Sequence, residues 1–120
     1  MATMFNFEKL ETWHEAIAFA DCVYQLTRAF PAEERFGLTN QMRRAAVSIS
    51  SNLAEGCSRS SKSDYARFVE IATGSVFEVV SQATIGRNQG FLDPTGYDQL
   101  YAAAEKQSRM LSGLRNSLVA

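Results

Sequence analysis

The sequence is poor in residues that interrupt helices and in residues that build metal or disulfide centres. Its 120 residues include 2 prolines, 7 glycines, 2 cysteines and 1 histidine. Scarce proline and glycine favour long uninterrupted helices. Cys22 and Cys57 stand far apart with no second pair, so neither a zinc knuckle nor a disulfide framework is supported. We therefore expect two reduced thiols, no metal site and no cofactor.

Long apolar runs are also missing. No stretch approaches the roughly 20 apolar residues that a membrane-spanning helix needs. The N-terminal residues MATMFNFEKL combine neither a basic region nor an apolar run, so they do not resemble a secretory signal. We expect a cytoplasmic protein without membrane contact. Residues 1–120 are expected to form a single domain, long enough for one core.

An excess of positive charge is absent as well. The 12 basic and 13 acidic residues give a net charge of −1, which is unfavourable for a nucleic-acid binder. The basic residues are nevertheless concentrated in residues 43–67, where Glu55 and Asp64 are the only acids. These side chains could contact phosphates or merely solvate a surface. The candidates are Arg43, Arg44, Arg59, Lys62 and Arg67.

What the sequence does contain is apolar residues at helical spacing. Four helices are expected, at about 8–28, 39–55, 62–88 and from Pro94 to Leu118. Ser61 and Asp93 are predicted N-caps, whereas Gly56 and Gly90 are predicted to end helices. Short breaks between four helices predict an all-α fold, an up-down-up-down antiparallel four-helix bundle. In the first helix the predicted inner stripe is Leu10, Trp13, Ile17, Ala20 and Tyr24.

A polar row runs along the second helix beside its apolar stripe, about 100° around the axis. It could be a packed structural network or an open binding surface. We expect the network, since a buried charge left alone is costly, and Arg44→Ala would then cost on the order of 3 kcal/mol. The row, with the third-helix residues expected to oppose it, is Gln41, Arg44, Ser48, Asn52, Glu55, Ser75 and Glu78.

A second apolar face is predicted away from the inner stripes. Phe77 points almost opposite the inner stripe of the third helix, and a monomer would leave such a face in water. We therefore expect burial between identical subunits. The candidate interface residues are Val47, Ala54, Phe77 and Val80.

Catalytic motifs are not found. Glu11 and His14 match a Glu-x-x-His spacing, but a di-iron bundle needs that motif twice, and the chain has 1 histidine. No nucleophile is paired with His14 by motif, and no Gly-x-Ser-x-Gly or Walker loop occurs. The serine-rich turn 58–63 could cradle a phosphate, although such turns more often cap a helix. We expect no enzyme activity, no catalytic residues and no metal.

Several short motifs together resemble the bacterial 23S rRNA intervening-sequence proteins. The most specific piece is SISSNLAEG at 48–56. The others are LETW at 10–13 with Ala16, FP at 30–31 with Glu34, FGL at 36–38, QMRRA at 41–45, Arg59, Phe68, IA at 71–72, and GS at 74–75 with Glu78. The resemblance extends from about Phe5 to Leu118.

The resemblance implies a small helical bundle that assembles as a homopentamer, and some family members are encoded within insertions in 23S rRNA genes. A related branch, the accessory variability determinants of diversity-generating retroelements, forms a basic barrel that binds nucleic acid and a reverse transcriptase. This chain differs from that branch in its net charge of −1. The leading hypothesis is a non-enzymatic homo-oligomeric adaptor associated with RNA or a ribonucleoprotein. The alternative is a protein-binding scaffold that does not bind nucleic acid.

Overall fold

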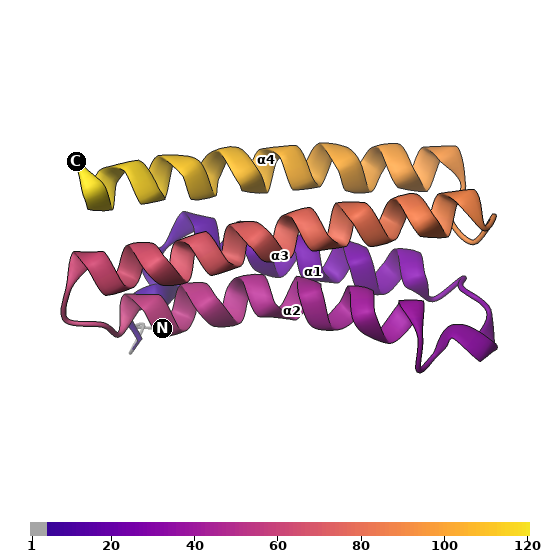
Figure 1. The fold of residues 1–120 in the computed structure, drawn as a ribbon, viewed down its shortest axis with the longest axis horizontal. Helices are drawn as coiled ribbons and strands as arrows, with labels where there is room; N and C mark the ends of the chain where they lie inside the picture. The colour runs from indigo at the N-terminus through magenta and orange to yellow at the C-terminus, as the bar shows by residue number, and fades with distance from the viewer. Residues whose placement is uncertain (1–4) are drawn as a thin grey trace.

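The computed structural model describes residues 5–120 and consists of four long helices lying side by side (Figure 1). The helices are α1 (Glu11–Thr27), α2 (Leu38–Cys57), α3 (Lys62–Asn88) and α4 (Pro94–Val119). Two short 3₁₀ turns, η1 (Asn6–Lys9) and η2 (Ala32–Glu34), precede α1 and α2. The chain reverses direction at each connection, which confirms the predicted up-down-up-down antiparallel bundle.

The four helices surround one apolar core. Each helix packs against two others, since α1 and α3 both contact α2 and α4. Fully burying one large aliphatic side chain stabilises the fold by roughly 1.5–3 kcal/mol. Within residues 5–120, no helix combines the length and the apolar character that crossing a membrane requires. The largest fully buried apolar side chains include Met42, Ile49, Leu53, Leu100 and Leu111.

The helix ends follow local sequence signals. The Ser61 side chain accepts a hydrogen bond from Asp64 N at 3.1 Å, and the Asp93 carboxylate accepts one from Gly96 N at 2.7 Å. Both predicted N-caps are therefore confirmed. Gly90 follows α3 with a φ of 79°, a conformation that glycine adopts without steric cost, and it ends the helix as predicted.

Gly56 has a different role from the one predicted. It lies inside α2, which continues to Cys57, and it is buried. A Cβ at this position would lie 2.9 Å from Phe68 Cβ and 3.1 Å from Tyr65 Cδ1. Real Cβ atoms essentially never lie as close as 2.9 Å to another side-chain atom, so the glycine allows α2 and α3 to approach closely. The expectation of a helix-ending glycine here is wrong, because tertiary packing rather than a turn requires it.

The first helix is also rotated relative to its predicted stripe. Ile17 and Tyr24 are exposed, whereas Phe19 and Val23 are buried. Apolar residues occur on several sides of this helix, so spacing alone did not identify the buried side. The buried face also includes polar residues. The hydroxyl of Thr27 can be buried there because its Oγ1 donates a hydrogen bond to Val23 O at 2.7 Å within the helix. The residues buried in α1 are Thr12, Ala16, Phe19, Ala20, Val23 and Thr27.

Candidate nucleic-acid interface

The centre of the predicted polar row links α2 to α3. Ser48 Oγ lies 3.1 Å from Ser75 Oγ across the two helices. Asn52 Nδ2 donates to Ser48 Oγ at 3.0 Å and to the Ser48 carbonyl at 2.7 Å. Ser75 is buried, and the other two are half-buried. These three residues form a hydrogen-bonded contact between the helices, as a structural role requires.

The other four members of the row, three of them charged, lie outside this contact. Gln41, Arg44, Glu55 and Glu78 are exposed in the single chain. Glu78 accepts a hydrogen bond from Gln82 Nε2 at 3.1 Å, whereas the Arg44 guanidinium forms no hydrogen bond or ion pair within residues 5–120. Within the single chain, the seven residues therefore do not form one packed network: Ser48, Asn52 and Ser75 link the helices, and the other four are exposed.

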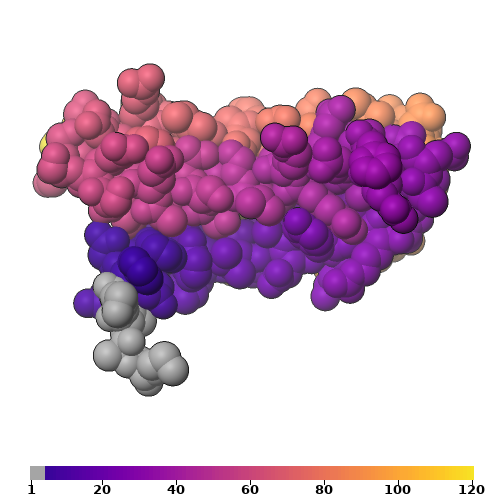
Figure 2. All heavy atoms as spheres, turned by 90° about the horizontal axis from the view of Figure 1, so that it is seen from below, coloured from indigo at the N-terminus to yellow at the C-terminus, as the bar shows by residue number. Residues whose placement is uncertain are grey.

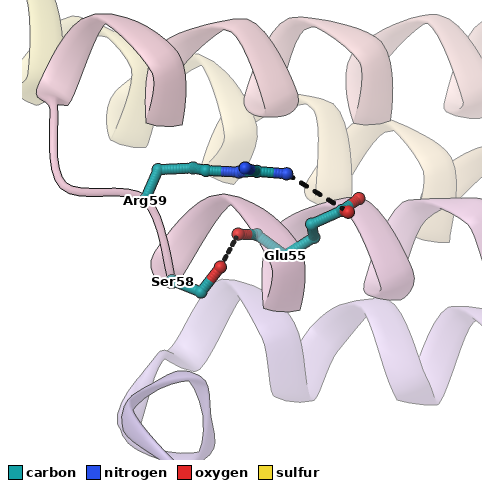
Figure 3. A network of polar contacts seen from close by, with 3 residues as sticks. All are labelled: Glu55, Ser58 and Arg59. Atoms are coloured by element: carbon teal, nitrogen blue, oxygen red, sulfur yellow. Dashed lines mark hydrogen bonds and ion pairs between the residues drawn. The ribbon is translucent and has the colours of Figure 1, made fainter.

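Glu55 is engaged locally at the end of α2 (Figure 3). Its Oε1 lies 3.3 Å from Arg59 Nη2, and its carbonyl accepts a hydrogen bond from Ser58 Oγ at 2.6 Å. The Arg59 guanidinium also covers the Phe68 ring, 4.8 Å from its centroid. The serine-rich turn thus provides caps, with Ser58 closing α2 and Ser61 opening α3.

The five predicted phosphate contacts do not form one patch. Arg59, Lys62 and Arg67 belong to the turn between α2 and α3 and to the start of α3. Arg43 and Arg44 lie in the first half of α2, whose rise of about 1.5 Å per residue separates Arg44 from Arg59 by roughly 20 Å. The α2–α3 turn and the α1–α2 connection are at opposite ends of the bundle (Figure 1). The basic region is therefore split between two ends.

Arg43 is fixed against α1. Its Nε donates to Thr27 Oγ1 at 2.9 Å, and its Nη2 lies 3.4 Å from the Tyr24 carbonyl. Its guanidinium also covers the Tyr24 ring, 4.6 Å from the centroid. These contacts hold the charge in one place with little conformational freedom.

A groove of about 560 Å³ surrounds this arginine, where α1, the connection after η2 and α2 meet. Arg35 and Arg44 add two further positive charges, and no acidic residue lines it. Figure 2 shows the side of the molecule formed by α1 and α2, with the connection between them at the end away from the N-terminus. We call this the arginine groove. Its lining residues are Tyr24, Arg35, Phe36, Thr39, Asn40, Arg43, Arg44, Val47 and Ser48.

Five residues of the arginine groove are not among the candidates from the sequence: Tyr24, Arg35, Phe36, Thr39 and Asn40. Phe36 is 86% exposed, the largest exposed fraction among the large hydrophobic side chains described. The adjacent pair Arg35 and Phe36 in a connection is a usable signal, because an aromatic beside arginine suits nucleic-acid binding. Helical spacing could not reveal it, since the connection is not part of a regular helix.

The four predicted interface residues occupy two sides of the bundle. Phe77 is 66% exposed, and with Val80 it lines a groove of about 380 Å³ between α3 and α4, beside Tyr101. Val47 instead lines the arginine groove. Ala54, also on α2, is half-buried. The predicted second apolar face is thus not one patch, because residues at outward positions of α2 and α3 face different neighbouring helices.

The remaining reactive side chains do not gather into a centre. Within residues 5–120, no group of three or more His, Cys, Asp or Glu side chains could hold a metal ion. His14 Nε2 lies 2.7 Å from the Glu8 carbonyl. Burial raises the pKa of Cys22, while burial and the 3.0 Å contact with Cys57 Sγ raise the pKa of Tyr65. Both groups therefore favour the protonated form.

Comparison with known proteins agrees with this architecture. A solved structure of a protein of unknown function from Bacteroides thetaiotaomicron VPI-5482, described as belonging to the S23 ribosomal protein family, has 16% sequence identity and a TM-score of 0.77. The similarity covers 87% of this chain and 97% of that one, and at this identity it shows the fold alone. No curated protein matches significantly. The family model of the 23S rRNA-intervening sequence protein matches residues 8–113, so the chain belongs to that family.

Proposed function

We propose that this protein is a non-enzymatic, homo-oligomeric adaptor that associates with RNA or a ribonucleoprotein. The observation that carries the RNA-binding part is the arginine groove. Its three arginines, Arg35, Arg43 and Arg44, concentrate positive charge on a chain whose net charge is −1. Phosphate contacts by arginine supply much of the affinity of nucleic-acid complexes. The family name associates its members with 23S rRNA.

Arg44 is the most informative residue for this proposal. Its side chain is exposed and forms no hydrogen bond or ion pair within residues 5–120. It also borders a second hollow of about 310 Å³ between α2 and α3, which Gln41 and Glu78 line as well. An arginine that does not support the fold is available for a ligand. Arg59, Lys62 and Arg67 are proposed as secondary contacts at the other end of the bundle.

The oligomer is proposed to use the Phe77 side of the bundle. Phe77 and Val80 line an apolar groove there, and Ile71 and Ile85 on the same helix are also exposed. Burying such residues against another subunit removes apolar area from water, at about 25 cal/mol per Å². The family resemblance implies five subunits. Ala54 stays a candidate for the same assembly, whereas Val47 is assigned to the wall of the arginine groove.

The test measures binding of a labelled RNA hairpin with a single-stranded loop at increasing salt. We expect affinity to fall steeply with salt, as counterion release requires. Arg44→Glu is expected to lower affinity about tenfold, the loss of one charge-assisted phosphate contact. The matched control is Arg109→Glu, the same charge change at an exposed position on α4, which lies away from the groove.

Two outcomes would contradict RNA binding through this groove. Equal losses for Arg44→Glu and Arg109→Glu would show a general charge effect instead of a site. No binding above background at low salt would favour the alternative, a scaffold that binds another protein.

A further inference from the structure

We propose that the arginine groove binds an unpaired nucleotide, with the base stacked on Phe36 and the adjoining phosphates held by Arg35 and Arg44. This inference rests on the proposed RNA-binding function and specifies which form of RNA is recognised. It predicts that the protein prefers single strands and loops over duplex RNA.

Phe36 offers a ring that the fold does not use. It is 86% exposed and belongs neither to the buried core nor to the partly buried residues that pack against it. Each residue beside it in the groove is polar or charged except Tyr24 and Val47. A base stacking on an aromatic ring contributes about 1–3 kcal/mol, with little dependence on which base it is. The ring is therefore a suitable platform for a base.

The other aromatic ring of the groove is already occupied. The guanidinium of Arg43 covers Tyr24 at 4.6 Å from the ring centroid, while hydrogen bonds to Thr27 Oγ1 and the Tyr24 carbonyl hold it in place. Thr27 Oγ1 is itself held by its bond to the Val23 carbonyl at 2.7 Å. This part of the groove is preorganised, so binding here loses little side-chain freedom.

Groups suited to the rest of a nucleotide surround the ring. Arg35 and Arg44 are exposed and form no ion pair within residues 5–120, which leaves their donors available to phosphate oxygens. Asn40 lines the groove and carries both a donor and an acceptor for a base edge. The groove volume of about 560 Å³ falls within the roughly 300–1,000 Å³ of typical ligand pockets.

Duplex RNA does not suit this arrangement. Its bases are paired and stacked on one another, so only edges and backbone are accessible, whereas unpaired bases can stack on protein side chains. Phosphate contacts alone would not distinguish the two forms. A preference for single strands therefore depends on the ring of Phe36.

The experiment compares three labelled RNAs of about 12 nucleotides, a length within the range that single-strand-binding modules cover: a single strand, its duplex, and an abasic strand with the same phosphates. Affinities are measured for the parent, Phe36→Ser and Phe36→Trp. We expect the parent to prefer the single strand over the other two. Phe36→Ser should lower single-strand affinity about tenfold and leave abasic binding unchanged, while Phe36→Trp keeps the preference. Light scattering of each variant reports its oligomeric state.

Each possible failure has a distinct meaning. Equal parent affinity for the duplex and the single strand overturns the inference and leaves RNA binding intact. If Phe36→Ser loses as much affinity for the abasic strand as for the normal strand, base stacking on this ring is overturned. A changed mass for Phe36→Ser would show that another copy of the chain covers the ring, which also overturns it. Absence of binding to all three RNAs overturns both this inference and the proposed function.

Discussion

Phe36 and Phe77 are both exposed phenylalanines, but their surroundings differ. Phe36 is 86% exposed and lies among arginines in the connection that leads into α2. Phe77 is 66% exposed and lines an apolar groove in the middle of α3, next to Val80 and Tyr101. Exposure alone therefore does not distinguish the two rings, whereas their neighbouring side chains do. Arginines favour a nucleic acid, whereas apolar neighbours favour another protein surface.

Replacing each ring with a charge tests this difference most strongly. Phe77→Asp should dissociate the proposed oligomer while keeping the helical circular-dichroism signal, because a buried unpaired charge costs too much for the contact to persist. Phe36→Asp should leave the mass unchanged. Light scattering measures the mass of both variants. Unfolding of Phe77→Asp would place Phe77 in the core of its own bundle, and dissociation of Phe36→Asp would remove the distinction between the two rings.

A third test concerns the close contact between α2 and α3 at Gly56. Gly56→Ala should lower the free energy of unfolding by about 1–3 kcal/mol, because the added Cβ would lie 2.9 Å from Phe68 Cβ. Gly113→Ala is the control, since nothing lies within 4 Å of its Cβ position, and it should stabilise the helix by about 0.5–1 kcal/mol. Urea unfolding measures the free energy of unfolding of both variants. An increase for Gly56→Ala would contradict the tight packing.

Two adjacent arginines of the groove should contribute differently to stability. Arg43→Ala removes the charged donor to Thr27 Oγ1 and should cost about 1–3 kcal/mol in urea unfolding. Arg44→Ala should cost no more than about 1 kcal/mol, since exposed side chains contribute little. This replaces the cost of about 3 kcal/mol expected from a packed network. A large cost for Arg44→Ala in the oligomer, with RNA affinity unchanged, would place Arg44 between subunits.

Features that depend on neighbours along the chain were predictable. The limits of α3, the caps at Ser61 and Asp93 and the end at Gly90 agree with expectation, because a cap involves residues within one turn. The face of α1 was misjudged because Phe19 and Val23 compete with Ile17 and Tyr24 for the same core.

The candidate site was predictable only in part. Arg43 and Arg44 were recognised as basic candidates, and the structure places both in the arginine groove. Arg35 and Phe36 were not recognised, because residues in an irregular connection have no period from which a direction can be calculated. Val47 was grouped with Phe77, although the two line different grooves. The error arose from treating outward positions on two helices as neighbours.

The order of residues along this chain specifies four helices, their ends and most of their buried faces, because backbone hydrogen bonds, caps and apolar periodicity act over a few residues. It does not specify which exposed side chains from different elements meet. That depends on how α1, α2 and their connection pack, which brings Tyr24, Phe36 and Arg44 to one groove. Close packing through Gly56 likewise depends on the distance between two helices, a quantity that no local pattern contains.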